Sequence, residues 1–180
     1  MVKIGVSNLK ARPGSELDFC LKENWSYLKT SEAKLPIIAP VVVQGRVTNN
    51  KGIFTVTAKV ATTLELICDR CLSKYNLKVS VPLEELYAEG SVIKSLPEEN
   101  EKEDQEIRLL EKYQIDLGPA VNQALIMALP MKFLCKEDCL GLCSQCGQNL
   151  NKGQCQCESD SIDLRFEVLK QWLNNKEGEK

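Results

Sequence analysis

The sequence predicts an α+β fold in which an antiparallel β-sheet or open barrel is flanked by helices and followed by a cysteine-rich C-terminal module. Apolar and polar residues alternate over long stretches separated by turn residues, and other apolar residues recur at helical spacing. Six of the nine cysteines lie between residues 135 and 157. We expect an α+β body over residues 1–130 and the cysteine-rich module, with a final helix, over 131–180.

The N-terminal segment fits a capped amphipathic helix. Ser15 and Asp18 form a capping pattern ahead of apolar residues at helical spacing. These apolar residues would share one face: Leu17, Cys20, Leu21, Trp25 and Leu28. We therefore expect Cys20 in the core, where a free cysteine behaves as a small buried hydrophobe. A reactive thiol at Cys20 is the alternative.

A β-hairpin is predicted after this helix. The segment from Val41 to Val47 contains four valines, and the turn sequence Asn-Asn-Lys-Gly follows at 49–52. From Phe54 the apolar residues then alternate with polar partners as far as Cys68. This pattern is typical of two antiparallel strands.

A second turn should follow the hairpin directly. Period-two alternation restarts over residues 77–83, so the chain must reverse between Asp69 and Tyr75. The pair Cys68-x-x-Cys71 then lies where one strand ends and the next begins. An antiparallel sheet of at least three strands results.

The region between the sheet and the cysteine-rich module alternates between charge and short apolar runs. We expect an acidic loop over about 90–106, because its charged part has too few apolar residues to order itself. Residues 107–110 should return to the sheet. Asp116-Leu117-Gly118-Pro119 then opens a helix that Pro130 closes, and Asp163 should cap the final helix.

The composition argues against catalysis. The chain has no histidine, so Ser-His and Cys-His nucleophile pairs are excluded. It also has neither a phosphate-binding glycine loop nor a G-x-S-x-G elbow. We expect a protein that is not an enzyme, and a Mg²⁺-dependent ribonuclease working through carboxylates is the least favoured alternative.

The expected compartment is the cytoplasm. The start MVKIGVSNLK lacks the apolar run of a signal peptide, and no stretch is long and apolar enough for a membrane span, so no membrane partner is expected. Ordinary thiols stay reduced there, and clustered cysteines then indicate metal rather than disulfides.

Charge is unevenly distributed along the chain. Residues 1–83 carry twelve Lys and Arg against six Asp and Glu, whereas residues 84–116 carry four against eleven. The net charge of −2 does not fit a generic polyanion binder. A basic face on the first half could still make weak contact with RNA or an anionic partner.

The primary candidate metal site lies at the centre of the cysteine-rich module. Cys143-x-x-Cys146-Gly147 has the form of a zinc knuckle, and Cys155-x-Cys157 can complete a tetrahedral shell of four thiolates. A Cys₄ zinc is coordinatively closed, so it would contribute folding energy rather than activate water. Disulfides and an iron–sulfur cluster are the alternatives. We expect a zinc module over 131–180.

A possible second site would join two distant parts of the chain. Cys68, Cys71, Cys135 and Cys139 could form another Cys₄ site that pins the predicted turn to the C-terminal segment. Spacing alone does not decide the partners, because Cys135 and Cys139 could instead join the knuckle. Whether one or two zinc ions bind is therefore open.

The Cys68-Asp69-Arg70-Cys71 sequence also allows a different function. Arg70 could lower a thiol pKa, which would suit a thiol-redox or metal-sensing protein that uses Cys68 and Cys71. The motif follows a strand, however, and does not open a helix as in thioredoxin-like proteins.

Taken together, these motifs resemble the YceD family of bacterial ribosomal-RNA accumulation proteins, over roughly residues 35–173. Leu164 departs from the family pattern, in which a proline commonly stands at that position. Some relatives lack most of the C-terminal cysteines, which implies that zinc serves stability in this branch. The matching pieces are Cys68-Asp69-Arg70-Cys71-Leu72, Ile115-Asp116-Leu117, Leu129-Pro130, Leu134-Cys135, CLGLCSQCGQNLN from Cys139, Cys155-x-Cys157 and Ile162-Asp163-x-Arg165.

The resemblance implies a role in the synthesis, processing or stability of large-subunit ribosomal RNA. Genes of the family often lie beside one for a large-subunit ribosomal protein. We therefore expect a non-catalytic zinc protein that binds a ribosomal protein or a large-subunit assembly intermediate and protects precursor RNA without cutting it. The oligomeric state is not indicated by the sequence.

Overall fold

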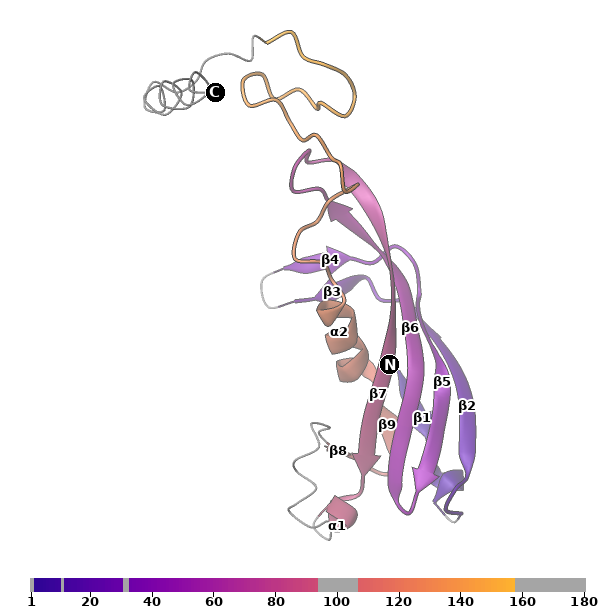
Figure 1. Cartoon of the computed structure of the whole chain (residues 1–180). Helices are drawn as coiled ribbons and strands as arrows, with labels where there is room; N and C mark the ends of the chain where they lie inside the picture. The colour runs from indigo at the N-terminus through magenta and orange to yellow at the C-terminus, as the bar shows by residue number, and fades with distance from the viewer. Residues whose placement is uncertain (1, 11, 31–32, 94–106, 158–180) are drawn as a thin grey trace, which may run out of the picture.

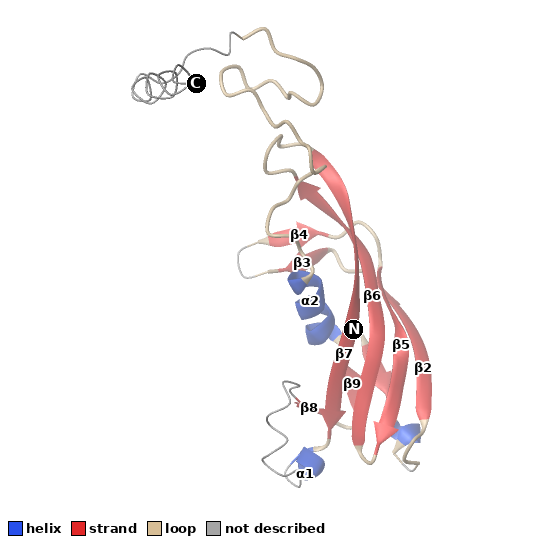
Figure 2. Ribbon diagram, in the orientation of Figure 1, coloured by secondary structure: helices blue, strands red, loops and turns tan. Residues whose placement is uncertain are grey.

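A computed structural model describes residues 2–10, 12–30, 33–93 and 107–157. Most of this part of the chain is β-structure, and the largest sheet curls into a half-barrel (Figures 1 and 2). The predicted antiparallel sheet or open barrel is therefore confirmed. In spatial order the five strands are β2 (Glu16–Glu23), β5 (Val41–Asn50), β6 (Ile53–Ile67), β7 (Lys74–Ala88) and β8 (Ile107–Leu109).

The β5–β6 hairpin forms where the alternating pattern predicts it. Its two loop residues, Lys51 and Gly52, have φ angles of 54° and 94°, as a tight hairpin turn with matching twist requires. Asn49 is buried, donates from Nδ2 to the carbonyl of Leu9 at 2.6 Å and accepts from the Gly52 N–H at 2.9 Å. The hairpin is thereby attached to the N-terminal segment.

Strands β6 and β7 are each 15 residues long and extend beyond their neighbour β5. Pairing between β5 and β6 ends at Val42 and Ala61, whereas pairing between β6 and β7 continues to Ile67 and Lys74. We call the extension, residues 62–67 and 74–79, the β6–β7 ribbon (Figure 1). The predicted second turn closes it at residues 68–73.

Shorter elements complete the body. Residues 107–109 return to the sheet as predicted, and β8 pairs with β7 in parallel. Two small antiparallel pairs were not predicted: β1 (Lys3–Gly5) with β9 (Gln114–Asp116), and β3 (Tyr27–Lys29) with β4 (Lys34–Pro36). The two shortest helices are η1 (Ser7–Leu9) and α1 (Gly90–Ile93), and α1 occupies the start of the expected acidic loop.

Helix α2 (Gly118–Met127) confirms the predicted helix, although it ends before Pro130. Pro119 lies at its first turn, and the buried Val121 and Leu125 join the core. The helix contacts β7 and β3. The largest fully buried side chains of the body are Phe54, Leu28, Leu64, Ile115, Leu117, Leu125, Val2, Val6, Val41, Val43, Val47 and Val56.

The predicted N-terminal helix is wrong. The segment forms strand β2, which pairs antiparallel with β5 from Glu16–Thr48 to Glu23–Val41. From Asp18 onward, exposed residues alternate with half-buried ones, which is the alternation of an edge strand. The spacing of the apolar residues is compatible with a helix and with a strand. Pairing with the open edge of β5 favours the strand.

The core position predicted for Cys20 is also wrong. Cys20 is exposed in the middle of β2, opposite Gln44. The change of period from helix to strand turns its side chain to the solvent face, because successive strand residues alternate in direction.

Several predictions concern residues outside the described ranges. The final helix at Asp163 and the charged run over 97–106 lie there. The boundary between a body over 1–130 and a module over 131–180 stays a prediction. Among the described residues, no helix is both long enough and apolar enough to cross a membrane.

Candidate metal centres

The first candidate centre, here the hairpin cluster, consists of Cys68, Cys71, Cys135 and Cys139. The first two lie in the turn that closes the β6–β7 ribbon, and the other two lie in the segment that follows α2. The sulfur atoms of Cys68 and Cys139 are 3.8 Å apart, and those of Cys71 and Cys135 are 3.6 Å apart. All four sulfurs lie within 4.8 Å of one another.

Hydrogen bonds fix the C-terminal segment against the turn. The backbone N–H of Asp69 donates to the carbonyl of Phe133 at 2.7 Å, and the N–H of Phe133 donates to Oδ2 of Asp69 at 2.7 Å. The Arg70 guanidinium donates to the carbonyl of Cys139 at 3.0 Å. These three contacts join residues 133–139 to the turn, and none of them involves a sulfur atom.

The hairpin cluster is largely removed from solvent. Cys68, Cys71 and Cys139 are 0%, 4% and 2% exposed, and Tyr75 and Leu134 are among the residues packed against them. A reagent in solution therefore has little access to these thiols. Burial weighs against Cys68 and Cys71 as freely reactive redox cysteines, which are normally accessible.

The second candidate centre, here the loop cluster, consists of Cys143, Cys146, Cys155 and Cys157. Its four sulfurs also lie within 4.8 Å of one another. The knuckle turn is closed by the Gly147 N–H, which donates to the carbonyl of Cys143 at 2.9 Å, and Gly147 has a φ of 73°. This turn presents the first two thiols to the same point, as a zinc knuckle does.

The thiols of the hairpin cluster differ in pKa. Burial raises the pKa of the Cys68 thiol, but backbone N–H groups directed at its sulfur outweigh burial and lower that pKa to about 6. Those N–H groups belong to Cys135, Cys71 and Arg70. In contrast, burial and then the neighbouring thiols raise the pKa of Cys135 to about 12. Four adjacent thiolates repel one another, and a cation would relieve that repulsion.

The loop cluster has the same asymmetry. Backbone N–H groups of Cys146 and Gln145 lower the pKa of Cys143 to about 6. Hydrogen bonding with Cys146, followed by burial, raises the pKa of Cys157 to about 12. In each cluster, therefore, one thiol ionises readily and another resists ionisation in the absence of a cation.

The donor sets fit a four-coordinate metal ion. A Zn–S bond of about 2.3 Å gives a tetrahedron whose sulfur–sulfur edges are about 3.8 Å. The two distances recorded in the hairpin cluster, 3.6 and 3.8 Å, agree with such an edge. Each group of four cysteines could bind a metal ion, and thiolates select soft or borderline metals such as zinc or iron.

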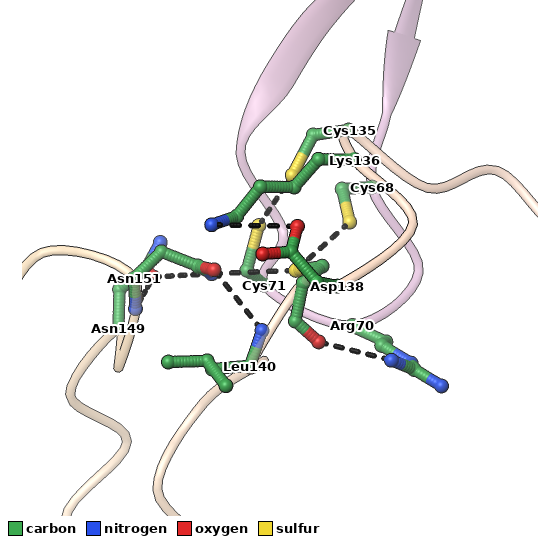
Figure 3. A network of polar contacts seen from close by, with 10 residues as sticks. Cys68, Arg70, Cys71, Cys135, Lys136, Asp138, Leu140, Asn149 and Asn151 are labelled. Carbon is green, nitrogen blue, oxygen red and sulfur yellow. Dashed lines mark hydrogen bonds and ion pairs between the residues drawn. The ribbon is translucent and has the colours of Figure 1, made fainter.

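Two asparagines between Cys146 and Cys155 lie beside the hairpin cluster (Figure 3). Nδ2 of Asn151 donates to the sulfur of Cys139 at 3.3 Å, and Oδ1 of Asn151 accepts from the Leu140 N–H at 3.0 Å. Nδ2 of Asn149 donates to the hydroxyl of Ser73 at 3.1 Å. The Ser73 hydroxyl is in turn the largest influence that lowers the pKa of Cys71.

Spacing named the eight cysteines that the structure gathers into two groups of four, but it could not pair them. The structure brings Cys135 and Cys139 to Cys68 and Cys71 rather than to the knuckle. Asp69, Ser73 and the two asparagines were missed as partners of the clusters. Asparagine in a loop ordinarily indicates a turn, and no pattern in the sequence distinguishes one that also contacts a thiol.

The chain is similar to known proteins over about two thirds of its length. The model of the YceD family, described as large ribosomal RNA subunit accumulation protein YceD, matches residues 56–173, a range that includes both clusters. Uncharacterized proteins of Mycobacterium bovis and Mycobacterium tuberculosis are 38% identical over 118 residues. These matches cover 66% of this chain and 55% of each mycobacterial protein.

A plant protein is also similar. The chloroplastic YCED homolog 1 of Arabidopsis thaliana, named as a large ribosomal RNA subunit accumulation protein, is 28% identical over 68 residues. That match covers 36% of this chain and 21% of the plant protein. No solved structure matches the chain.

Proposed function

This chain belongs to the YceD family of large ribosomal RNA subunit accumulation proteins, and from that premise we propose that it is a non-catalytic zinc protein supporting accumulation of large-subunit ribosomal RNA. It would do so by binding a ribosomal protein or an assembly intermediate of the large subunit. The observation that carries the metal part is the assembly of the hairpin cluster from cysteines 64 and 71 residues apart.

In this proposal each cluster holds one Zn²⁺ through its four thiolates. When bound, zinc supplies a closed tetrahedral shell and therefore folding energy, with no open position for a substrate. Cys68, Cys71, Cys135 and Cys139 would tie the segment after α2 to the β6–β7 ribbon. The loop cluster would close its own loop. Iron is the main competitor for the same ligands.

A protein partner suits the surface near the hairpin cluster. Ile67, Leu72 and Leu140 are 56%, 64% and 64% exposed there. Apolar side chains on such a surface favour contact with another protein over contact with RNA phosphates. Direct contact with ribosomal RNA would then be weak, in keeping with a net charge of −2. We place the protein in the cytoplasm, where thiols stay reduced for metal binding.

Sedimentation of the tagged protein from growing native cells tests the cellular role. The wild-type protein should travel with large-subunit precursors, and Cys71→Ser should move it to the top of the gradient and lower the amount of mature large-subunit RNA. Cys20→Ser is the matched control, because Cys20 is exposed and outside both clusters. Wild-type protein that stays at the top, or purified protein that cuts precursor RNA, would contradict the proposal.

Elemental analysis of purified protein tests the metal. Two zinc ions per chain are expected in wild type and Cys20→Ser, and one in Cys143→Ser/Cys146→Ser. Iron in place of zinc would change the metal but keep the sites. No bound metal in any variant would refute the metal part of the proposal.

A thiol-redox or metal-sensing role for Cys68 and Cys71 is the second candidate, favoured by the lowered pKa of Cys68. It requires rapid alkylation of these two thiols in the metal-loaded protein. Protection of both thiols, with alkylation of Cys20 as the internal control, would support structural sites instead.

A further inference from the structure

The two clusters are physically connected through residues 149–151. These residues lie in the eight-residue link between Cys146 and Cys155, so they belong to the loop cluster by sequence. The side chain of Asn151 nevertheless contacts Cys139 of the hairpin cluster, and that of Asn149 contacts Ser73, beside the cluster in the turn. One short segment therefore contributes to both candidate metal centres.

The orientation of the Asn151 amide follows from its partners. The Leu140 N–H can only donate, so the oxygen of the amide must face it, and the nitrogen then faces the Cys139 sulfur. The second hydrogen on that nitrogen goes to Oδ1 of Asn149 at 3.0 Å. Every polar group of the Asn151 side chain is thus used, which fixes its position.

We infer that Asn149 and Asn151 are positioning residues that couple the two metal centres, so that zinc in one cluster raises the zinc affinity of the other. The inference rests on the proposed zinc binding. Metal in the hairpin cluster would fix the position of Cys139, and Nδ2 of Asn151 donates to the sulfur of that residue. Asn151 is then held in place, and with it the link to Cys155.

Ordering the link in advance lowers the cost of binding metal in the loop cluster. An unliganded loop must lose conformational freedom when its four thiols close on an ion. Part of that loss has already occurred when the asparagines are held by the hairpin cluster. By thermodynamic linkage the effect is reciprocal, so metal in the loop cluster must strengthen binding at the hairpin cluster equally.

Zinc titration of the full-length metal-free protein against a competing chelator measures the coupling. The product of the two dissociation constants in wild type is compared with the product from two variants that each keep one cluster. These variants are Cys68→Ser/Cys71→Ser and Cys143→Ser/Cys146→Ser. We expect the wild-type product to be about tenfold smaller, the scale on which partners of metal ligands act.

The same three zinc titrations are then repeated with Asn151→Asp added to each protein. Aspartate is nearly the same size and keeps the acceptor for the Leu140 N–H, but it cannot donate to the Cys139 sulfur. The two products should become equal in this background, whereas a space-filling role would leave the tenfold difference. Asn76→Asp is the matched control, because Asn76 is exposed on β7.

The possible outcomes separate the inference from the function on which it rests. Two zinc ions that bind with no difference between the products, or a difference that Asn151→Asp leaves unchanged, would overturn the coupling alone. No zinc in the wild-type protein would overturn both. A tenfold difference that Asn151→Asp removes and Asn76→Asp preserves would establish it.

Discussion

The hairpin and loop clusters use the same four-thiol chemistry in opposite structural settings. In the hairpin cluster three of four cysteines are buried, whereas in the loop cluster Cys146 is exposed and the other three are intermediate. The hairpin cluster joins residues 64 positions apart, from Cys71 to Cys135. The longest link inside the loop cluster runs only from Cys146 to Cys155.

This difference teaches that position in the chain, more than ligand type, decides what a metal centre stabilises. Closing a loop costs entropy that grows with the logarithm of its length, and the two links differ about sevenfold in length. The cost that the hairpin cluster offsets is therefore larger by about 2 kcal/mol. The hairpin cluster attaches a segment to the body, and the loop cluster shapes that segment internally.

Metal removal should expose the difference most strongly. Structural zinc contributes an apparent binding free energy of about 10 kcal/mol or more to small domains. After chelation, amide hydrogens over residues 133–157 should exchange at the earliest time points, while those of β5 and β6 stay protected by their own core. Hydrogen exchange measured by mass spectrometry checks this, and added zinc should restore protection. Equal protection with and without chelator would contradict the comparison.

Substitution of one cysteine in each cluster should show which cluster contributes more to the free energy of unfolding. In zinc-loaded protein, Cys139→Ser is expected to lower the free energy of unfolding by about 2 kcal/mol more than Cys146→Ser, because it weakens the site that closes the longer loop. Urea denaturation gives both values. Cys20→Ser should change little, since its side chain is exposed. Equal losses, or a larger loss for Cys146→Ser, would reverse the ranking.

Two glycines with similar backbone conformations allow the packing around the two clusters to be compared. Gly141 and Gly147 have φ angles of 79° and 73°, so alanine at either should cost about 1 kcal/mol. A Cβ at Gly141 would also lie 3.2 Å from the carbonyl oxygen of Arg70, whereas one at Gly147 would meet nothing within 4 Å. Gly141→Ala should therefore lower Tm more than Gly147→Ala. Equal Tm values for Gly141→Ala and Gly147→Ala would show that the turn around Arg70 shifts without loss of stability.

The smallest expected effect concerns a contact that does not involve sulfur. Asp69→Ala removes the acceptor of the Phe133 N–H and should lower the free energy of unfolding by about 1 kcal/mol. Asp138→Ala is the control. The Asp138 side chain is 83% exposed and its Oδ1 lies 3.7 Å from Nζ of Lys136, and such an exposed ion pair contributes little to stability. Thermal unfolding of the two variants compares them. A larger loss from Asp138→Ala would argue against Asp69 as an anchor.

Local patterns were enough to predict the long strands and helix α2. The valines of positions 41–47 and the alternation of apolar and polar residues from Phe54 onward, with Asn-Asn-Lys-Gly between them, fit only a β-hairpin. Strands of three residues, such as β1 and β9, are too short to show a period and form because distant segments meet. The prediction for strand β2 was wrong for a related reason. Its local pattern favours a helix, but pairing with the free edge of β5, a distant segment, makes it a strand.

The candidate centres were predicted in the same partial way. The spacing of Cys143, Cys146, Cys155 and Cys157 is local, and the structure gathers these four residues. Which thiols meet Cys68 and Cys71 depends on how a long intervening chain folds, which spacing does not encode. That the ribbon turn meets residues 133–139 follows from the course of the chain after α2.

The length of the β6–β7 ribbon sets how far its turn lies from the end of β5. Its six residues beyond Ala61 correspond to about 20 Å at the rise of an antiparallel strand. Deleting two residues from each of its strands would keep every side chain on its original face and bring the turn about 7 Å closer to the body. A partner that spans both ends of the molecule would lose one of its contacts, whereas a partner held at either end alone would bind as before.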